Sequence, residues 1–312
     1  MTLPAAVLHI SNHILSLLSN HTSPPLFVAL QGPQGSGKSY LSNLVRSHLS
    51  AAPYALNVVV LSVDDLYLTH QGLVDLAQRH PENPLWSGRG QPGTHDVELG
   101  VAVLNSLKEG SPVELPRFDK SLFNGEGDRL PMDGTGTIVE LPVDVFIMEG
   151  WFTGFYPISL QELESRWDGI WARERKVLNL DDTVVGTKDN IIAVNEELVR
   201  YMELWSFFDV FIKLEAASSS SSLSEPASSL STIYKWRLEQ EHNMKARNGG
   251  KGMTDAAVKL FVDRYIPGYV FFGDGVFKGY DREDGSVVPR WLGRSLRISI
   301  DKKREVVAVQ KF

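Results

Sequence analysis

The chain has 312 residues, with 31 Lys and Arg against 38 Asp and Glu, so its formal net charge is −7. This acidic balance argues against non-specific binding to nucleic acid, which requires a basic surface. The sequence contains no cysteine, which excludes disulfides, thiolate metal sites and cysteine nucleophiles in this chain.

The first predicted element is a helix that begins near Ala5 and ends near Asn20, in an N-terminal segment that ends near residue 24. Its apolar residues are similar to those of a signal peptide, but His9, Asn12 and His13 interrupt them and no basic residue precedes them. We therefore expect an amphipathic helix. No stretch reaches the roughly 18 apolar residues that a membrane span requires, so we expect a cytoplasmic protein.

Short apolar segments then alternate with helical patterns, an order typical of a parallel sheet covered by helices on both faces. The predicted strands are Leu26–Gln31, 58–63, 143–148 and 208–214. The predicted helices are Lys38–Ser50, Val97–Lys108, 195–205, 233–246 and 255–265, and a terminal hairpin is predicted at Leu296–Ile300 and 306–310. The expected fold class is therefore α/β.

Two polar segments do not follow this pattern. Residues 178–190 are rich in turn-forming residues, and nine of the fifteen residues from 218 to 232 are serine. A serine-rich stretch buries too little apolar surface to order itself. Because strand and helix patterns resume directly after both segments, we predict surface insertions at 178–190 and 216–232 within one domain spanning residues 1–312.

The segment between the first predicted strand and the next helix reads GPQGSGKS and matches the pattern G-x-x-x-x-G-K-[ST]. Glycines let this backbone curl so that its N–H groups face phosphate oxygens, and the helix N-terminus faces the same anion. We expect Lys38 to reach the β- and γ-phosphates and the Ser39 hydroxyl to reach Mg²⁺. The predicted ATP-binding residues are Gly32, Pro33, Gln34, Gly35, Ser36, Gly37, Lys38, Ser39 and Tyr40.

An acidic pair follows the second predicted strand in the sequence SVDDLY. The carboxyl end of such a strand lines the ligand crevice of a doubly wound sheet. A carboxylate there can accept the proton of a substrate hydroxyl that attacks the γ-phosphoryl group. Asp64 and Asp65 are adjacent, so we expect one of them to face the phosphates, whereas Asp65 could equally cap a following helix.

Two further loops concentrate polar side chains. In RGQPGTHD, Arg89, His95 and Asp96 suit a small polar or anionic substrate, although capping of the next helix is the favoured interpretation for Asp96. No second histidine lies near His95, which argues against a metal site there. In LPRFDKSLFNGEGD, a glycine-rich turn follows Arg117, Asp119 and Lys120. Without further context this segment would be an ordinary charged turn.

Glu149 directly follows the third predicted strand, within VDVFIMEG. This carboxylate is a candidate second contact to Mg²⁺ through water, since Mg²⁺ keeps several waters in protein sites. Its alternative is a strand-end carboxylate that faces solvent. Beyond Glu149, the aromatic residues Trp151, Phe152, Phe155 and Tyr156 are expected to be core.

Basic residues also surround the glycine-rich segment 248–252, among them Arg237, Lys245 and Arg247. Mobile cations that close over a transferring phosphoryl group stabilise its negative charge and exclude water. The region 233–265 is therefore a candidate lid. A solvated helix face is an equally good interpretation of each single residue.

In this order, the motifs resemble those of the phosphoribulokinase/uridine kinase type of P-loop kinases. Within that group the chain is most similar to the glycerate kinase branch, which comprises plant-type D-glycerate 3-kinases and related fungal ATP-dependent kinases. The segments that carry the resemblance are GPQGSGKS, SVDDLYLT, RGQPGTHD, PRFDKS, VFIMEGW, GMTD and RYIPGY. GPQGSGKS is generic, whereas SVDDLYLT, RGQPGTHD and PRFDKS are far more specific.

The resemblance implies a P-loop NTPase fold, ATP and Mg²⁺ as cofactors, Asp64 as the catalytic base and Tyr67 near the acceptor. It also implies that Asp96 contacts acceptor hydroxyls, and that Glu149 lies near Mg²⁺. Leu66 replaces the phenylalanine usual in the family motif, which changes packing but not the chemistry.

We therefore expect an ATP-dependent kinase that phosphorylates a hydroxyl of a small polar acceptor, with D-glycerate favoured. The expected catalytic residues are Asp64 and Lys38, and the expected metal contacts are Ser39 and Glu149. The expected acceptor residues are Asp65, Tyr67, Arg89, His95, Asp96, Arg117 and Asp119. The alternatives are a nucleoside- or pantothenate-type kinase, or a nucleotide-binding regulatory protein without transfer activity.

Overall fold

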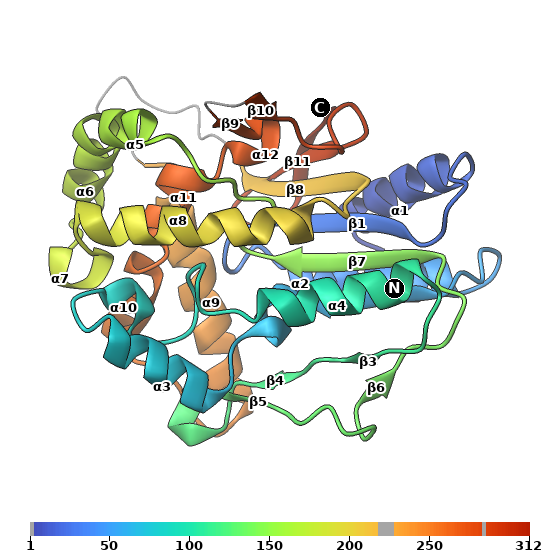
Figure 1. Ribbon diagram of the computed structural model, residues 1–312, viewed down its shortest axis with the longest axis horizontal. Helices are drawn as coiled ribbons and strands as arrows, with labels where there is room; N and C mark the ends of the chain where they lie inside the picture. Colours follow the sequence, from blue (N-terminus) through green and yellow to red (C-terminus); the bar gives the residue numbers. More distant parts are fainter. Residues whose placement is uncertain (1–2, 218–227, 283–284) are drawn as a thin grey trace.

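A six-stranded sheet forms the centre of the computed structural model, which describes residues 3–217, 228–282 and 285–312 (Figure 1). Its strand order is β12-β11-β8-β1-β7-β2, and all pairs are parallel except β11 with β12. The strands are β1 (Leu26–Gln31), β2 (Val58–Ser62), β7 (Val145–Gly150), β8 (Val210–Ala216), β11 (Leu296–Ile300) and β12 (Val306–Lys311). The predicted α/β class, its strands and its terminal hairpin are confirmed.

Twelve α-helices occur in the described part of the chain. They are α1 (Ala5–Leu18), α2 (Lys38–Ser50), α3 (His70–Arg79), α4 (Val97–Lys108), α5 (Leu160–Arg166), α6 (Ala172–Leu178), α7 (Asp182–Val185), α8 (Lys188–Trp205), α9 (Ser231–Arg247), α10 (Asp255–Asp263), α11 (Ile266–Phe272) and α12 (Gly275–Lys278). The sequence patterns did not predict α3, α5, α6, α7, α11 or α12. None of the helices in the described residues is long and apolar enough to span a membrane.

The two faces of the sheet have separate hydrophobic cores. Along β1, Leu26, Val28 and Leu30 pack with α1 and α2, whereas Phe27 and Ala29 belong to the core that includes α4 and α8. Figure 1 shows α4 and α8 in front of the sheet. All six side chains of β1 are buried, as expected for a central parallel strand covered on both faces.

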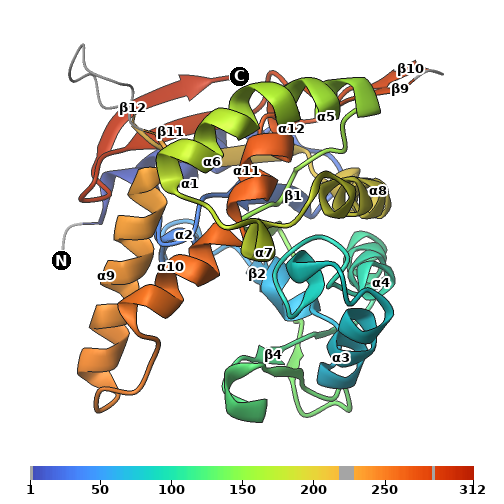
Figure 2. The ribbon, with the colours of Figure 1, turned by 90° about the vertical axis from the view of Figure 1, so that its left-hand side faces the viewer.

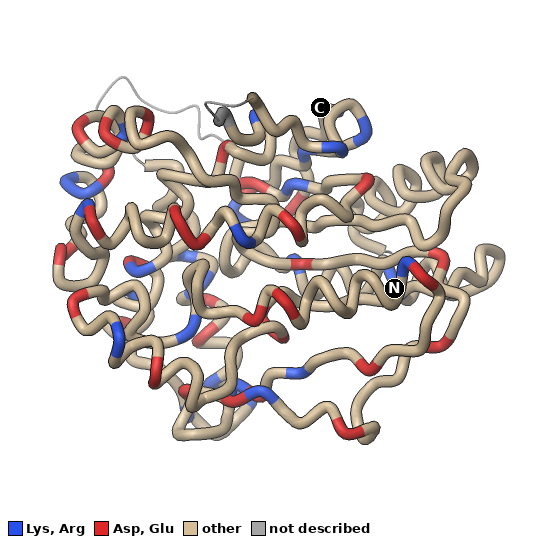
Figure 3. Tube along the Cα trace, in the orientation of Figure 1, with Lys and Arg blue, Asp and Glu red and all other residues tan. Residues whose placement is uncertain are grey.

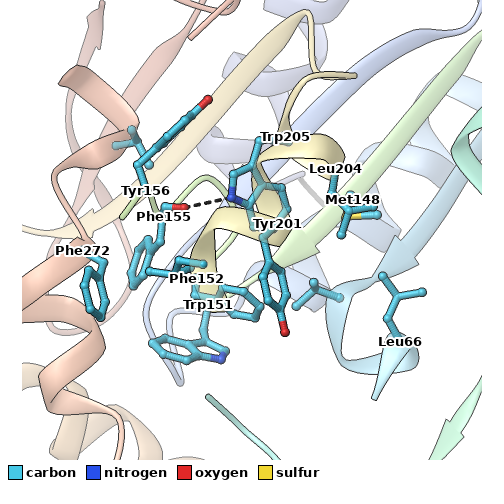
Figure 4. Close-up of a cluster of buried hydrophobic side chains, with 14 of the residues drawn as sticks. Leu66, Met148, Trp151, Phe152, Phe155, Tyr156, Tyr201, Leu204, Trp205 and Phe272 are labelled. Carbon is cyan, nitrogen blue, oxygen red and sulfur yellow. Dashed lines mark hydrogen bonds between the residues drawn. The ribbon is translucent and has the colours of Figure 1, made fainter. Parts of the chain in front are cut away.

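The aromatic residues after β7 are core, as the sequence analysis expected. Trp151, Phe152 and Phe155 are almost fully buried, and the Phe152 ring packs against Tyr201 and Trp205 of α8 (Figure 4). The Trp205 indole N–H donates to the Phe155 carbonyl oxygen at 2.9 Å. This cluster fixes the chain that leaves the carboxyl end of β7.

The predicted surface insertion at 178–190 is wrong in part. It contains α7 and the start of α8, and Val185 is fully buried there. Helix α8 begins earlier than the predicted helix 195–205, because Thr187 and Asn190 form a capping box at its N-terminus. Most of the second predicted insertion, residues 218–227, lies outside the described residues, and its last residues belong to α9, which begins at Ser231.

Three two-stranded ribbons extend from the main sheet. They are β3 (Glu114–Leu115) with β6 (Thr137–Ile138), β4 (Phe118–Asp119) with β5 (Asp128–Arg129), and β9 (Tyr280–Arg282) with β10 (Gly285–Val287). Figure 3 shows basic and acidic residues intermingled along the described chain rather than separated onto different sides. The carboxyl ends of β1, β7 and β2 meet at one edge of the sheet, where ligands of such folds bind.

Candidate active site

The P-loop leaves the carboxyl end of β1 and leads directly into α2. Gly35 has φ +74° and Gly37, the residue that precedes α2, has φ +87°. A Cβ atom at Gly35 would lie 2.6 Å from the Cβ of Trp236 in α9. Glycine at this position is therefore required both by the left-handed backbone and by the close approach of α9.

Side chains from distant parts of the chain hold the P-loop in place. The Tyr269 hydroxyl oxygen accepts a hydrogen bond from the Gln34 N–H at 3.1 Å. Arg304 Nε donates to the Gly35 carbonyl oxygen at 2.8 Å, and Arg304 lies in the turn between β11 and β12 with φ +68°. The loop's anion-binding shape thus depends on the C-terminal hairpin and on α11 as well as on its own glycines.

Ser39 and Glu149 form the second feature of the site. The Ser39 hydroxyl donates to Glu149 Oε1 at 2.7 Å, and Glu149 is 4 % exposed at the end of β7. Within the described residues, Glu149 Oε2 is buried and has no hydrogen-bond partner. A buried carboxylate oxygen without a donor is unfavourable unless a cation or a water satisfies it.

The hydroxyl and the carboxylate together fit Mg²⁺. This ion is commonly bound by one or two protein oxygens together with substrate phosphates. A dedicated cage of three or more His, Asp or Glu side chains does not occur among the described residues. The donor set therefore suits a metal that arrives with a nucleotide rather than a permanently held metal.

Asp64 lies directly after β2, in the 3₁₀ helix Val63–Leu66. The Tyr67 hydroxyl donates to Asp64 Oδ1 at 3.2 Å, and the Lys120 ammonium group forms an ion pair with Oδ2. Burial raises the pKa of Asp64, but the charge and hydrogen bond of Lys120 outweigh burial and hold that pKa well below its ordinary value.

The 3₁₀ turn directs Asp65 away from its neighbour. Asp65 accepts a hydrogen bond from the Phe118 N–H at 3.1 Å and so connects this turn to β4. Burial is the main cause that raises the pKa of Asp65, and the nearby charge of Asp64 adds to it. Asp65 therefore positions β4, which differs from both the helix cap and the direct acceptor contact considered from the sequence.

A cavity of about 1300 Å³ brings these features together. Figure 2 shows α9 on one side of the molecule and α3 and β4 on the other, and residues from both sides line the cavity. Its charged lining residues are Lys38, Asp64, Arg89, Lys120, Glu126, Glu149, Arg237, Glu241 and Arg264. A smaller recess of about 320 Å³ shares Ser39, Asp64, Lys120 and Glu149 with it and also borders Asp65.

Of the expected acceptor residues, Tyr67 and Arg89 line the large cavity. His95 lies behind Tyr67, with ring centroids 4.3 Å apart, and its Nδ1 is 3.0 Å from the Tyr201 hydroxyl oxygen. His95 is 2 % exposed, and burial lowers its pKa to about 3. His95 is thus a neutral support for Tyr67 and is not among the residues that line the cavity.

Asp96, Arg117 and Asp119 are also not among the lining residues of the cavity. Asp96 caps α4 by accepting from the Leu99 N–H at 3.0 Å, and it pairs with Arg129 at 2.7 Å. The capping interpretation of Asp96 is therefore confirmed. The side chain of Asp119 accepts from the Ser121 N–H at 2.8 Å and stabilises the turn locally.

The candidate lid residues differ in position. Arg237 lines the cavity, where it pairs with Glu241 at 2.8 Å and packs over the Phe261 ring. Lys245 donates to the Met253 carbonyl oxygen at 3.0 Å and so closes the loop between α9 and α10. Arg247, at the end of α9, is exposed and is not among the lining residues. Tyr40, expected at the nucleotide, is 64 % exposed on α2.

Sequence reasoning gave no individual role to several lining residues. The most important is Lys120, which was noted only as part of a charged turn in PRFDKS. Its position depends on the pairing of Phe118 with Arg129 and of Asp119 with Asp128, in strands too short to show a period. Other lining residues without an assigned role are His70, Asn124, Gly125, Glu126, Tyr265 and Arg264.

No protein-family model matches the sequence, but comparisons with individual known proteins identify similar kinases. The probable ATP-dependent kinase TDA10 of Saccharomyces cerevisiae is 36% identical over 294 residues, covering 92% of this chain and 88% of TDA10. The chloroplastic D-glycerate 3-kinase of Arabidopsis thaliana is 32% identical over 256 residues, covering 79% of this chain and 47% of that protein.

A solved structure of a D-glycerate 3-kinase from Cryptococcus neoformans is similar over 99% of both chains, with a TM-score of 0.82 and 37% sequence identity. The fold and the P-loop thus define an ATP-dependent kinase of the P-loop class. Within that class, the chain belongs to the family that contains TDA10 and the D-glycerate 3-kinases.

Proposed function

We propose that this kinase transfers the γ-phosphoryl group of ATP to a hydroxyl of D-glycerate. The observation that carries the proposal is the shared cavity, in which Lys38 and the Ser39–Glu149 pair face the same space as Asp64 and the cations of the acceptor side. The similarity to D-glycerate 3-kinases over most of this chain supports the same acceptor.

On the nucleotide side, the main chain of the P-loop would bind the triphosphate, and Lys38 would lie against its β- and γ-phosphates. Ser39 and Glu149 would hold Mg²⁺, which would neutralise charge on those phosphates when bound. The buried, unpartnered Oε2 of Glu149 supports this assignment.

On the acceptor side, Asp64 would accept the proton of the attacking hydroxyl. As the bond from the acceptor oxygen to the γ-phosphorus forms, the bond from that phosphorus to the β,γ-bridging oxygen breaks and ADP leaves. Positioning and charge stabilisation contribute most of the rate enhancement, because the transferred group needs little covalent assistance from the protein. Arg237 is the candidate lid cation, since it already lines the cavity.

The test is a measurement of ADP release by the purified protein with ATP, Mg²⁺ and a panel of acceptors. The panel contains D-glycerate, L-glycerate, glycerol, uridine and pantothenate, and the phosphorylated product is identified by mass spectrometry and NMR. We expect D-glycerate to give the highest kcat/KM and a 3-phosphorylated product. Turnover of uridine or pantothenate without turnover of D-glycerate would overturn the proposal.

A further inference from the structure

The ion pair between Lys120 and Asp64 is difficult to reconcile with a base that is ready to act. Each carboxylate oxygen of Asp64 already has a donor, since Tyr67 donates to Oδ1 and Lys120 pairs with Oδ2. A carboxylate held by an ammonium group is a weak proton acceptor. For Asp64 to accept a hydroxyl proton, its interaction with Lys120 has to weaken.

The surroundings of Asp64 indicate which group has to move. The titratable and charged groups that interact with Asp64 are Lys38 of α2, its chain neighbours Asp65 and Tyr67, His95 before α4, Lys120 after β4, and Tyr265 and Tyr269 beyond α10. Three of the aromatic residues are buried, namely Tyr67, His95 and Tyr265, and Tyr269 is partly buried. The Lys120 side chain, in contrast, is 53% exposed. Lys120 can therefore move without disturbing the core.

Protein partners hold the three arginines that line the cavity. Arg89 donates to the carbonyl oxygens of Gly125 and Glu126. Arg264 donates to the Arg89 carbonyl oxygen at 3.1 Å and to the Ser87 hydroxyl at 3.2 Å, and Arg237 pairs with Glu241. Lys120 differs from these arginines because it donates its hydrogen bond to the candidate base itself.

We infer that Lys120 is the residue that selects an anionic acceptor, by exchanging its ion pair with Asp64 for one with the acceptor's own carboxylate. The inference rests on the proposed function, because it assigns the recognition of that acceptor's charge. The lysine side chain suits such an exchange, since it carries a compact charge on a flexible stem. An acceptor that has a carboxylate near its hydroxyl binds Lys120 and frees Asp64 in the same step.

This exchange gives the selectivity a specific chemical basis. A neutral polyol such as glycerol offers the same kind of hydroxyl but no charge that competes with Asp64 for Lys120. Asp64 then stays paired and accepts the hydroxyl proton poorly. The enzyme thereby discriminates against uncharged acceptors both in binding and in the transfer step.

The test compares the wild-type protein with Lys120→Met, Lys120→Arg and Lys176→Met, using D-glycerate and glycerol as acceptors. Lys176 is an exposed lysine of α6 away from the cavity, so it controls for the loss of one positive charge. Thermal melting of each variant checks that it is folded. Lys120→Arg keeps the charge and remains informative if the methionine variant does not fold.

We expect Lys120→Met to raise the KM for D-glycerate about tenfold or more and to leave the KM for ATP within about twofold. Its preference for D-glycerate over glycerol should fall toward unity, whereas Lys120→Arg should keep part of that preference and Lys176→Met all of it. Because Lys120 lowers the pKa of Asp64, the acid limb of kcat/KM should move to higher pH in Lys120→Met.

An unchanged KM and an unchanged acceptor preference in Lys120→Met would overturn the inference, as would a change confined to the KM for ATP. Wild-type turnover of pantothenate instead of D-glycerate would overturn the proposed function alone. The same variants, tested with pantothenate and its uncharged alcohol analogue, would then decide the role of Lys120. Wild-type turnover of uridine alone would overturn both.

Discussion

The phosphate side and the acceptor side of the cavity are built in different ways. The proposed phosphate side consists of the neighbouring residues 32–39 between β1 and α2, whose main chain would supply the binding groups. The proposed acceptor side is assembled from separate loops, which carry the cavity-lining residues Asp64, Arg89, Lys120 and Tyr265. A short main-chain motif can bind the constant substrate, whereas side chains on separate loops can be exchanged to suit different acceptors.

The largest expected effect comes from the phosphate side. Lys38→Met should lower kcat/KM by about a thousandfold or more, because it removes the cation beside the transferring phosphoryl group. Steady-state ADP release measures this effect, with thermal melting as the folding control. A decrease in kcat/KM smaller than tenfold would contradict the expectation that the phosphate side contributes the largest effect.

Asp64→Asn should isolate the chemical contribution of the acceptor side. We expect kcat to fall about a hundredfold or more, since asparagine cannot accept the hydroxyl proton. The KM for ATP should stay within about twofold, because the P-loop is unchanged. Single-turnover measurements with saturating ATP would separate this effect from product release. An unchanged rate would remove Asp64 from the role of base.

Gly35→Ala tests how strictly the phosphate side depends on main-chain shape. Gly35 and Gly249 both have φ +74°, but a Cβ atom would clash with Trp236 only at Gly35 and would meet nothing within 4 Å at Gly249. We expect Gly35→Ala to lower the free energy of unfolding by about 2–3 kcal/mol and to weaken ATP binding. Gly249→Ala, the matched control, should cost about 1 kcal/mol. Urea denaturation measures both values, and equal values would contradict the importance of the contact with α9.

His95 allows a pH test of the buried support behind Tyr67. Its pKa is lowered from 6.5 to about 3, so the unfolded chain binds a proton that the native protein excludes. Stability should therefore fall as the pH decreases from 6.5 toward 3, by up to about 1.4 kcal/mol per pH unit from this group. Urea denaturation at several pH values should give a shallower slope for His95→Gln than for the wild type. The exposed His9→Gln variant is the control and should keep the wild-type slope.

The smallest effect is expected from Arg304, which connects the C-terminal hairpin to the P-loop. Arg304→Ala removes the hydrogen bond to Gly35 and the ion pair with Glu239, so we expect the KM for ATP to rise about three- to tenfold. The KM for the acceptor should not change. Lys303→Ala, in the exposed neighbouring position, is the matched control. An equal effect in both variants would show that the hairpin does not position the P-loop.

The sequence by itself determined the strands of the sheet, the P-loop and the α/β class. Each of these depends on residues that are adjacent in the chain: the apolar run of β1, the glycines of the loop and the helix that follows. Buried parallel strands and a phosphate-binding turn are local patterns, because the main chain within a few residues determines their geometry. The proximity of Ser39 and Glu149 could also be predicted from the sequence, since parallel strands end at a common edge of the sheet.

Only the tertiary structure decided which charged residues meet in the acceptor half. Lys120 reaches Asp64 across 56 residues because the short β4–β5 ribbon lies beside the turn after β2, an arrangement fixed by single contacts such as Asp65 to Phe118. His95 looked equally suitable for the acceptor, yet packing places it behind Tyr67. Side-chain geometry between distant loops depends on the packing of the whole molecule, and no local pattern in the sequence records it.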